Sequence, residues 1–202
     1  MKSTGTSKVK KLKAAVDAGM LDLNRLLTEY SDPHVIANAM KCYLREMPSP
    51  LLTFELHQDW VEAVQIPNPQ SKLQALWTVV DKLRCNYKQN FDNLSYLIKF
   101  LRELSKQQSV NKMTPANIAI VIAPNLLWAE NIDDVSSDIP MGLNMTKLTP
   151  LYTVIVEQLV THADYFFPEG KLDNEARRHG EQYYASIISS IPNPWAMLSC
   201  RC

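Results

Sequence analysis

The feature that most constrains this chain is a short, almost wholly apolar helix, predicted between Thr114 and Pro124. The hydroxyl of Thr114 can cap the start of this helix. Pro115 follows at the first helical position, where no backbone N–H donor is needed. Residues 118–123 are all isoleucine, valine or alanine, which is too continuously apolar for an ordinary surface helix. We therefore expect a helix that is buried on most sides and lies at the centre of the molecule, with Pro124 breaking it.

The amide of Asn125 directly follows this predicted helix. We expect it to be held at a fixed place by the helix before it and by the apolar residues 126–128 after it. A polar group placed in this way serves either a binding site or the C-terminal cap of the helix. Local physics alone does not decide between the two.

Composition indicates one soluble, all-α domain with a tail. The chain has 202 residues, five glycines, and 21 basic against 21 acidic residues, so its total charge supports neither a nucleic-acid nor a membrane-surface role. We expect no membrane insertion and no signal peptide. The four cysteines lack zinc-ligand spacing, and the histidines are scattered. The sequence therefore predicts a cytoplasmic monomer with no metal, no cofactor and no enzymatic chemistry of its own.

Apolar residues recurring at three- and four-residue steps predict helices along most of the chain, over residues 7–18, 33–47, 54–66, 70–83, 86–107 and 147–167. The first of these carries four lysines within six positions, which form either a docking patch or a solvated face. Residues 129–144 are acidic and lack periodicity, and we expect them to form a mobile loop. Residues 173–191 have the pattern of one more amphipathic helix.

A second polar pair lies on the helix predicted for residues 33–47. Asn38, Lys41 and Arg45 fall on a face away from the apolar stripe, and the last two lie one turn apart. Neighbouring cations repel unless an anionic group is near. This face is therefore either a solvated surface or a docking site.

Two stretches of this sequence resemble the signatures of RhoGAP domains, all-helical modules that accelerate GTP hydrolysis by Rho-family small GTPases. One is K-M-T-P-A-N-I-A-I-V-I-A-P-N-L-L-W from Lys112, and the other, about 70 residues earlier, is K-C-Y-L-R-E-M-P-S-P-L-L-T from Lys41. The chain departs from the usual pattern at Met47, where the family has leucine, and at Ala123, where it has glycine. If that glycine needs a positive φ, alanine strains the turn by about 1 kcal/mol or more and tilts Asn125.

The resemblance implies a binding site for a Rho- or Rac-family GTPase in its GTP-bound form. Lys41 is implied to contact the second switch loop of the GTPase, and Arg45 to support the site. Asn117 and Asn125 are implied to supply amides at the interface, Asn125 being the nearer to the nucleotide.

The resemblance also implies a missing catalytic group. In the family, a G-[IL]-[FY]-R loop supplies an arginine finger just before the helix matched here by residues 7–18, whereas this chain has no arginine before Arg25. We therefore expect residues 1–168 to form a RhoGAP domain without its first helix and finger loop, with no catalytic residue in the chain. Residues 169–202 are expected to be a C-terminal extension, partly helical or irregular. The ends of the domain look most like the nadrin branch, whose members carry a BAR domain and a proline-rich tail.

The sequence is compatible with two functions. The first is a GTPase activator whose stimulation is weak because the finger is absent, recruited to membranes or actin-rich sites only through partners or missing domains. The second is a non-catalytic module that binds the GTPase without accelerating hydrolysis.

Overall fold

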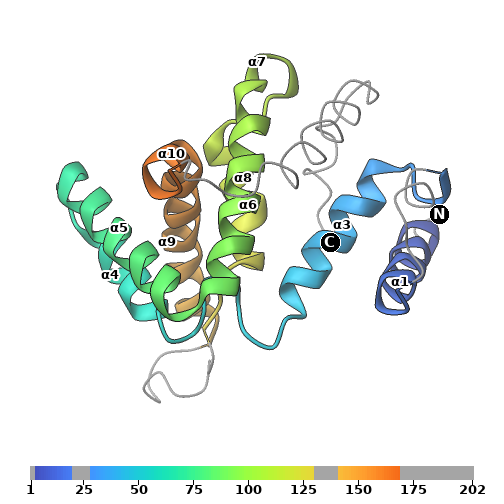
Figure 1. Cartoon of the computed structure of the whole chain (residues 1–202), viewed down its shortest axis with the longest axis horizontal. Coiled ribbons are helices and arrows are strands. Elements are labelled where there is room, and N and C mark those ends of the chain that lie inside the picture. The colour runs from blue at the N-terminus through green and yellow to red at the C-terminus, as the bar shows by residue number, and fades with distance from the viewer. Residues whose placement is uncertain (1–2, 20–27, 130–140, 169–202) are drawn as a thin grey trace.

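The computed structural model describes residues 3–19, 28–129 and 141–168, and within them it is built from helices without any strand. The predicted all-α fold is confirmed. Figure 1 shows the helices fanning out from a central group, with the hairpin of α4 and α5 at one side and α3 and α1 at the other.

The apolar helix predicted at the centre is α8 (Pro115–Ile122), which continues as a 3-10 turn, η1 (Ala123–Asn125). It begins as expected, because the Thr114 hydroxyl accepts a hydrogen bond from the Asn117 amide at 3.2 Å. It packs against α9 (Met141–Thr161) and α6 (Lys88–Lys106). Burial is not complete on every side, since Ile120 is 60% exposed.

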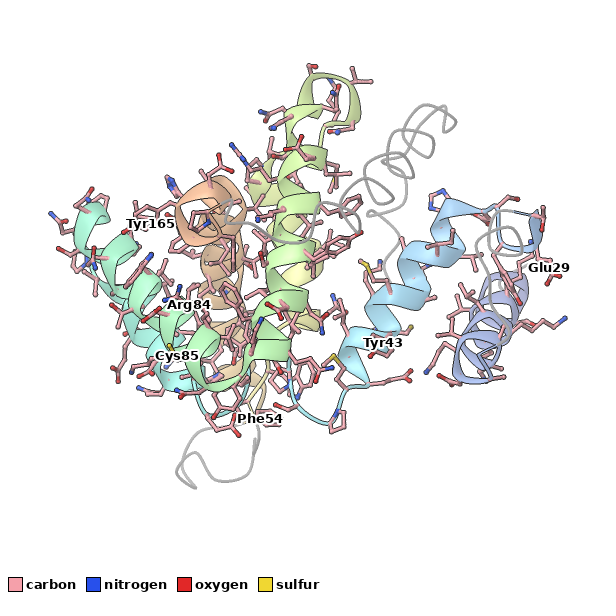
Figure 2. All side chains as sticks on the ribbon, in the orientation of Figure 1. Glu29, Tyr43, Phe54, Arg84, Cys85 and Tyr165 are labelled. Carbon is pink, nitrogen blue, oxygen red and sulfur yellow. The ribbon has the colours of Figure 1, made fainter. Side chains whose placement is uncertain are left out.

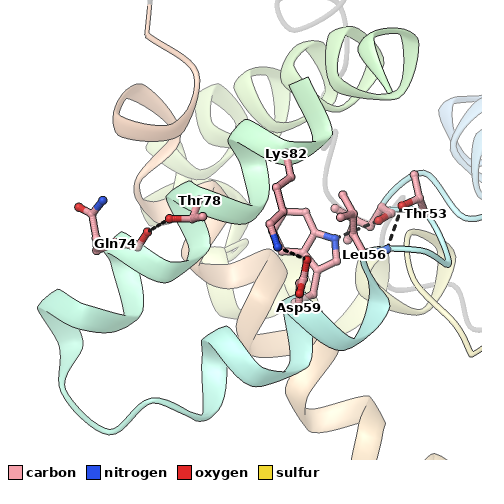
Figure 3. Close-up of polar contacts among 8 residues, drawn as sticks. Thr53, Leu56, Asp59, Gln74, Thr78 and Lys82 are labelled. Carbon is pink, nitrogen blue, oxygen red and sulfur yellow. Dashed lines mark hydrogen bonds and ion pairs between the residues drawn. The ribbon is translucent and has the colours of Figure 1, made fainter. Parts of the chain in front are cut away.

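Helices α4 (His57–Gln65) and α5 (Pro69–Asn86) form a hairpin whose apolar faces join the main core. The Asn68 side chain caps α5 by accepting from the Ser71 amide at 2.9 Å. On the outside of the hairpin Lys82 and Asp59 form an ion pair at 2.7 Å (Figure 3). Two short helices complete the bundle, α7 (Gln108–Asn111) and α10 (Ala163–Phe166).

Helix α3 (Pro33–Arg45) connects this core to α1 (Ser3–Asp17). One part of α3 contributes Leu44 to the main core, while another part packs Val35 and Ala39 around Leu12 of α1 in a separate small cluster. Figure 1 shows α1 beyond α3, on the side away from the other helices.

The structure differs from the predicted helix boundaries at several places, including the start of α1 at Ser3 rather than residue 7 and the end of α5 at Asn86 rather than residue 83. Helix α4 begins at His57 rather than residue 54, because residues 51–56 form turns. Helix α9 begins at Met141, so that Pro150 lies within the helix and not in its first turn. The predicted closing helix is also divided at His162, after which α10 begins. The centre of the predicted acidic loop, residues 130–140, and the C-terminal extension, residues 169–202, lie outside the described residues.

Candidate functional site

Helix α3 positions the two cations singled out by sequence, but in different environments. Asp32 caps this helix by accepting from the His34 amide at 3.0 Å, with proline following at the first helical position. Lys41 is only 3% exposed and has an interaction partner within the chain. Arg45, one turn later, is exposed, and its Nη2 lies 3.8 Å from the sulfur of Cys42. Arg45 is thus the cation of this pair that a partner can reach directly.

Asn125 is held rigidly at the end of the central helix. Its side chain is 5% exposed, and its Nδ2 donates to the carbonyls of Val121 and Ile122 at 2.9 and 3.2 Å. The amide therefore caps carbonyls that the helix leaves unsatisfied. Both of its N–H groups are used in this way, and among the described residues its Oδ1 accepts no hydrogen bond. Oδ1 is therefore the polar atom of this nearly buried side chain that has no donor within the described part of the chain.

Ala123, the departure from the family pattern, does not strain this turn. Its φ is −52° and its ψ is −43°, which are ordinary helical values, and its side chain is fully buried. The condition under which alanine would tilt Asn125, a positive φ, is not met in this chain.

Asn117 has a different role and position. It is exposed at the start of α8, and its Nδ2 donates to the Lys112 carbonyl at 2.8 Å. Lys112 itself adopts a φ of 60°, so this bond secures a tight left-handed turn before the helix. Asn117 lies about 12 Å along the helix from Asn125, at the rise of a regular helix. The structure thus places the two asparagines at opposite ends of α8.

The fold brings the segments of Arg45 and Asn125 together although they are far apart in the sequence. The turn η1 packs directly against α3. Just after α3, the Leu52 amide donates to the Leu126 carbonyl at 3.1 Å. The two motifs therefore adjoin through their backbones.

Sequence reasoning gave Asn38 no role, and the structure draws attention to it. Asn38 lies one turn before Lys41 on α3, and its buried Oδ1 has no hydrogen-bond partner among the described residues. A buried acceptor without a donor costs free energy. Its position on the polar face of α3 was the available signal.

The lysines of α1 lie in two different environments. Lys13 forms an ion pair with Glu46, at the end of α3, and this hydrogen bond raises the pKa of Lys13. Lys8, Lys10 and Lys11 are exposed to solvent. Exposed ion pairs contribute little to stability.

The described part of the chain has neither a grouped set of metal ligands nor a membrane-spanning helix. Its His, Cys, Asp and Glu side chains form no cluster of three or more that would hold a metal ion. None of its helices is both long enough and apolar enough to cross a membrane.

Comparison with known proteins identifies relatives along most of the chain. Residues 2–131 match the RhoGAP domain family. The chain is 44% identical over 193 residues to Rho GTPase-activating protein 44 of Mus musculus, covering 93% of this chain and 22% of that protein. It is 46% identical over 166 residues to Rho GTPase-activating protein 17 of Homo sapiens, covering 82% of this chain and 17% of that protein. The chain thus spans about a fifth of the length of these relatives.

A solved structure supports the same relationship at the level of the fold. The crystal structure of human Rho GTPase activating protein 15 aligns with a TM-score of 0.67 at 25% identity. The alignment covers 80% of this chain and 71% of that one.

Proposed function

The chain belongs to the RhoGAP family, and from that premise we propose that it docks on the switch regions of a Rho- or Rac-family GTPase in the GTP-bound form. The observation that carries this proposal is the packing of η1 against α3. Through this packing, α3, which carries the exposed side chain of Arg45, adjoins the segment that contains Asn125.

Each residue of the proposed interface has a role that follows from its environment. Arg45 presents a charged fork to carboxylates or carbonyls of the switch loops. Asn125 offers its Oδ1 from a turn that cannot shift without losing two hydrogen bonds. Lys41 is buried, so it acts mainly from within α3, by holding the neighbouring polar groups and adding positive potential.

The hydrolysis itself belongs to the GTPase, whose nucleotide, magnesium ion and attacking water carry out the reaction. An activating protein orders the switch loops and supplies positive charge to the transition state, and an arginine finger contributes about a thousandfold or more in rate. The first arginine of this 202-residue chain is Arg25, which follows the helix that the finger loop precedes in the family. We therefore propose that these 202 residues bind the GTPase well and accelerate hydrolysis weakly.

The second candidate is a module that binds without any acceleration. It uses the same surface as the weak activator. The two differ only in whether ordering of the switch loops, without a finger, raises the rate of GTP hydrolysis. Measuring hydrolysis and binding on the same preparation separates the two functions.

The docking proposal is tested by replacing Arg45 with alanine. We expect binding to a GTP-analogue-loaded Rac-type GTPase to weaken by about tenfold or more, as for a central charged contact. The matched control is Arg84→Ala, which removes an exposed arginine of α5 that pairs with Asp81. Figure 2 labels Arg84 on α5, away from α3, which carries Tyr43. Equal binding by both variants would contradict the proposed interface.

A further inference from the structure

The segment that follows α3 is an irregular chain whose leucines, Leu51 and Leu52, belong to the main core. We call residues 50–53 the strap. Its members are all buried, and Leu52 is completely inaccessible to solvent. Backbone N–H and C=O groups that are buried outside regular secondary structure need partners of their own. How the strap satisfies them shows what it is attached to.

Three separate parts of the molecule bind the strap backbone. The Leu52 amide donates to the Leu126 carbonyl at 3.1 Å. The Leu52 carbonyl accepts from the indole Nε1 of Trp60, on α4, at 2.9 Å. The Leu51 carbonyl accepts from Nδ2 of Asn90, on α6, at 3.1 Å. The strap is therefore fixed to α4, to α6 and to the residue that follows Asn125.

The strap also contains a strained residue. Thr53 has a φ of 63°, in the left-handed region that a β-branched side chain rarely adopts. Its amide donates to the Pro50 carbonyl at 2.9 Å, and its hydroxyl accepts from the Leu56 amide at 3.4 Å (Figure 3). Such a conformation persists where the surrounding structure imposes it. The strap thus has one defined shape.

This attachment has a consequence for the proposed docking surface. The strap leaves α3 within a few residues of Arg45 and is bonded to Leu126, next to Asn125. Any displacement of the strap changes the separation between the two groups that are proposed to contact the GTPase. Recognition by several fixed groups depends on their spacing. A group that is misplaced loses its contact with the partner, while the entropic cost of ordering the interface remains.

We propose that Asn90 is a positioning residue for GTPase recognition. It holds the strap, and through the strap it sets the separation of Arg45 and Asn125. This inference rests on the proposed function. Trp60 holds the same strap, but it is fully buried and also fills the core. Asn90 is half-buried, and within the described residues its side chain bonds to the strap alone. A substitution at Asn90 can therefore test how the strap is positioned without disturbing the packing of the core.

The experiment compares Asn90→Ala and Asn90→Asp with Asn93→Ala in the full chain. Asn93 is an exposed asparagine on the same helix, α6. Asn90→Asp preserves the side-chain shape but cannot donate when ionised. Affinity for a GTP-analogue-loaded Rac-type GTPase is measured per folded molecule, alongside hydrogen exchange of the Leu52 amide.

We expect both Asn90 variants to bind about tenfold more weakly, the order of one hydrogen bond that is lost, and to expose the Leu52 amide to exchange. Asn93→Ala should match the unmodified chain in both readouts. Restored binding in Asn90→Asp would show that side-chain volume matters rather than the donor, and would overturn the proposal. Faster Leu52 exchange with unchanged binding would overturn it as well. If the unmodified chain itself does not bind, the proposed function fails, and the positioning role fails with it.

Discussion

Asn125 combines a structural role in the fold with a place in the proposed interface. Its two N–H groups cap the end of α8 and fix the side chain, while its oxygen accepts no hydrogen bond among the described residues. In the proposed interface, the two roles that sequence left as alternatives, a C-terminal cap and a site residue, use different atoms of one amide. The burial of Lys41 was not predictable in the same way, because the polar face of a helix read from sequence does not reveal what packs over it.

Replacing Asn125 with alanine should lower the free energy of unfolding by about 1–3 kcal/mol, since buried carbonyls lose their donor. Chemical denaturation measures this effect. Asn117→Ala is the control on the same helix, where the side chain is exposed and makes one bond, and we expect it to cost under about 1 kcal/mol. If the two costs are equal, the capping role of Asn125 is wrong.

The contact between His57 and Tyr152 should make stability depend on pH. Nε2 of His57 lies 2.6 Å from the Tyr152 hydroxyl, between α4 and α9. Burial lowers the pKa of His57 below its usual 6.5 and raises the pKa of Tyr152 to about 12. The unfolded chain therefore binds a proton at His57 more readily than the folded chain does.

By linkage, the free energy of unfolding should be highest above about pH 6.5 and should fall as the pH drops from there toward the folded-state pKa of His57. Tyr152 stays protonated throughout this range. Denaturation at a series of pH values checks this. In His57→Gln, which cannot titrate, the slope in that window should be smaller, and an unchanged slope would assign the pH dependence to other groups.

At the scale of elements, helix starts with a polar cap followed by proline were predictable because their cause is local. The start at Pro115 was predicted from this signal, and the helix predicted from residue 33 also begins with a polar cap and proline, Asp32 and Pro33. The same signal at Asn68 and Pro69 begins α5, one residue before its predicted start. The start of α4 was not predictable, because Leu51 and Leu52, just before it, are held outside a helix by hydrogen bonds to Asn90, Trp60 and Leu126.

The candidate site was predicted only in part for the same reason. Family resemblance identified Arg45 and Asn125, and no local pattern reveals that η1 packs on α3, which depends on the whole fold. The attachment of the strap by Asn90 has no local signal either, because donor and acceptor are distant in sequence.

Helix α1 should behave as a separately unfolding element. Its buried contact with the rest of the described structure is the small cluster of Leu12, Val35 and Ala39. We expect Leu12→Ala to release α1 locally, seen as fast hydrogen exchange in α1, with little change in the unfolding midpoint of the bundle. Ile118→Ala, in the main core, should lower the free energy of unfolding by about 2–5 kcal/mol. A comparable loss from Leu12→Ala would show that α1 unfolds together with the core.

At the scale of the whole molecule, α3 is the link between two cores. It joins the large cluster around α8 to the small cluster under α1 and carries the proposed cationic contact at its end. The docking surface therefore depends on how firmly α3 is held by the main core and the strap, and less on α1.

These 202 residues are proposed to bind a GTP-loaded Rho-family GTPase without supplying a finger. The most direct test is single-turnover GTP hydrolysis by a Rac-type GTPase at saturating concentrations of this chain, with binding to the GTP-analogue-loaded form measured in parallel. We expect measurable binding that weakens in Arg45→Ala, and a rate that rises by less than about tenfold, because the finger supplies most of the acceleration. A rise of about a thousandfold or more, as an arginine finger gives, or the absence of binding, would contradict the proposal.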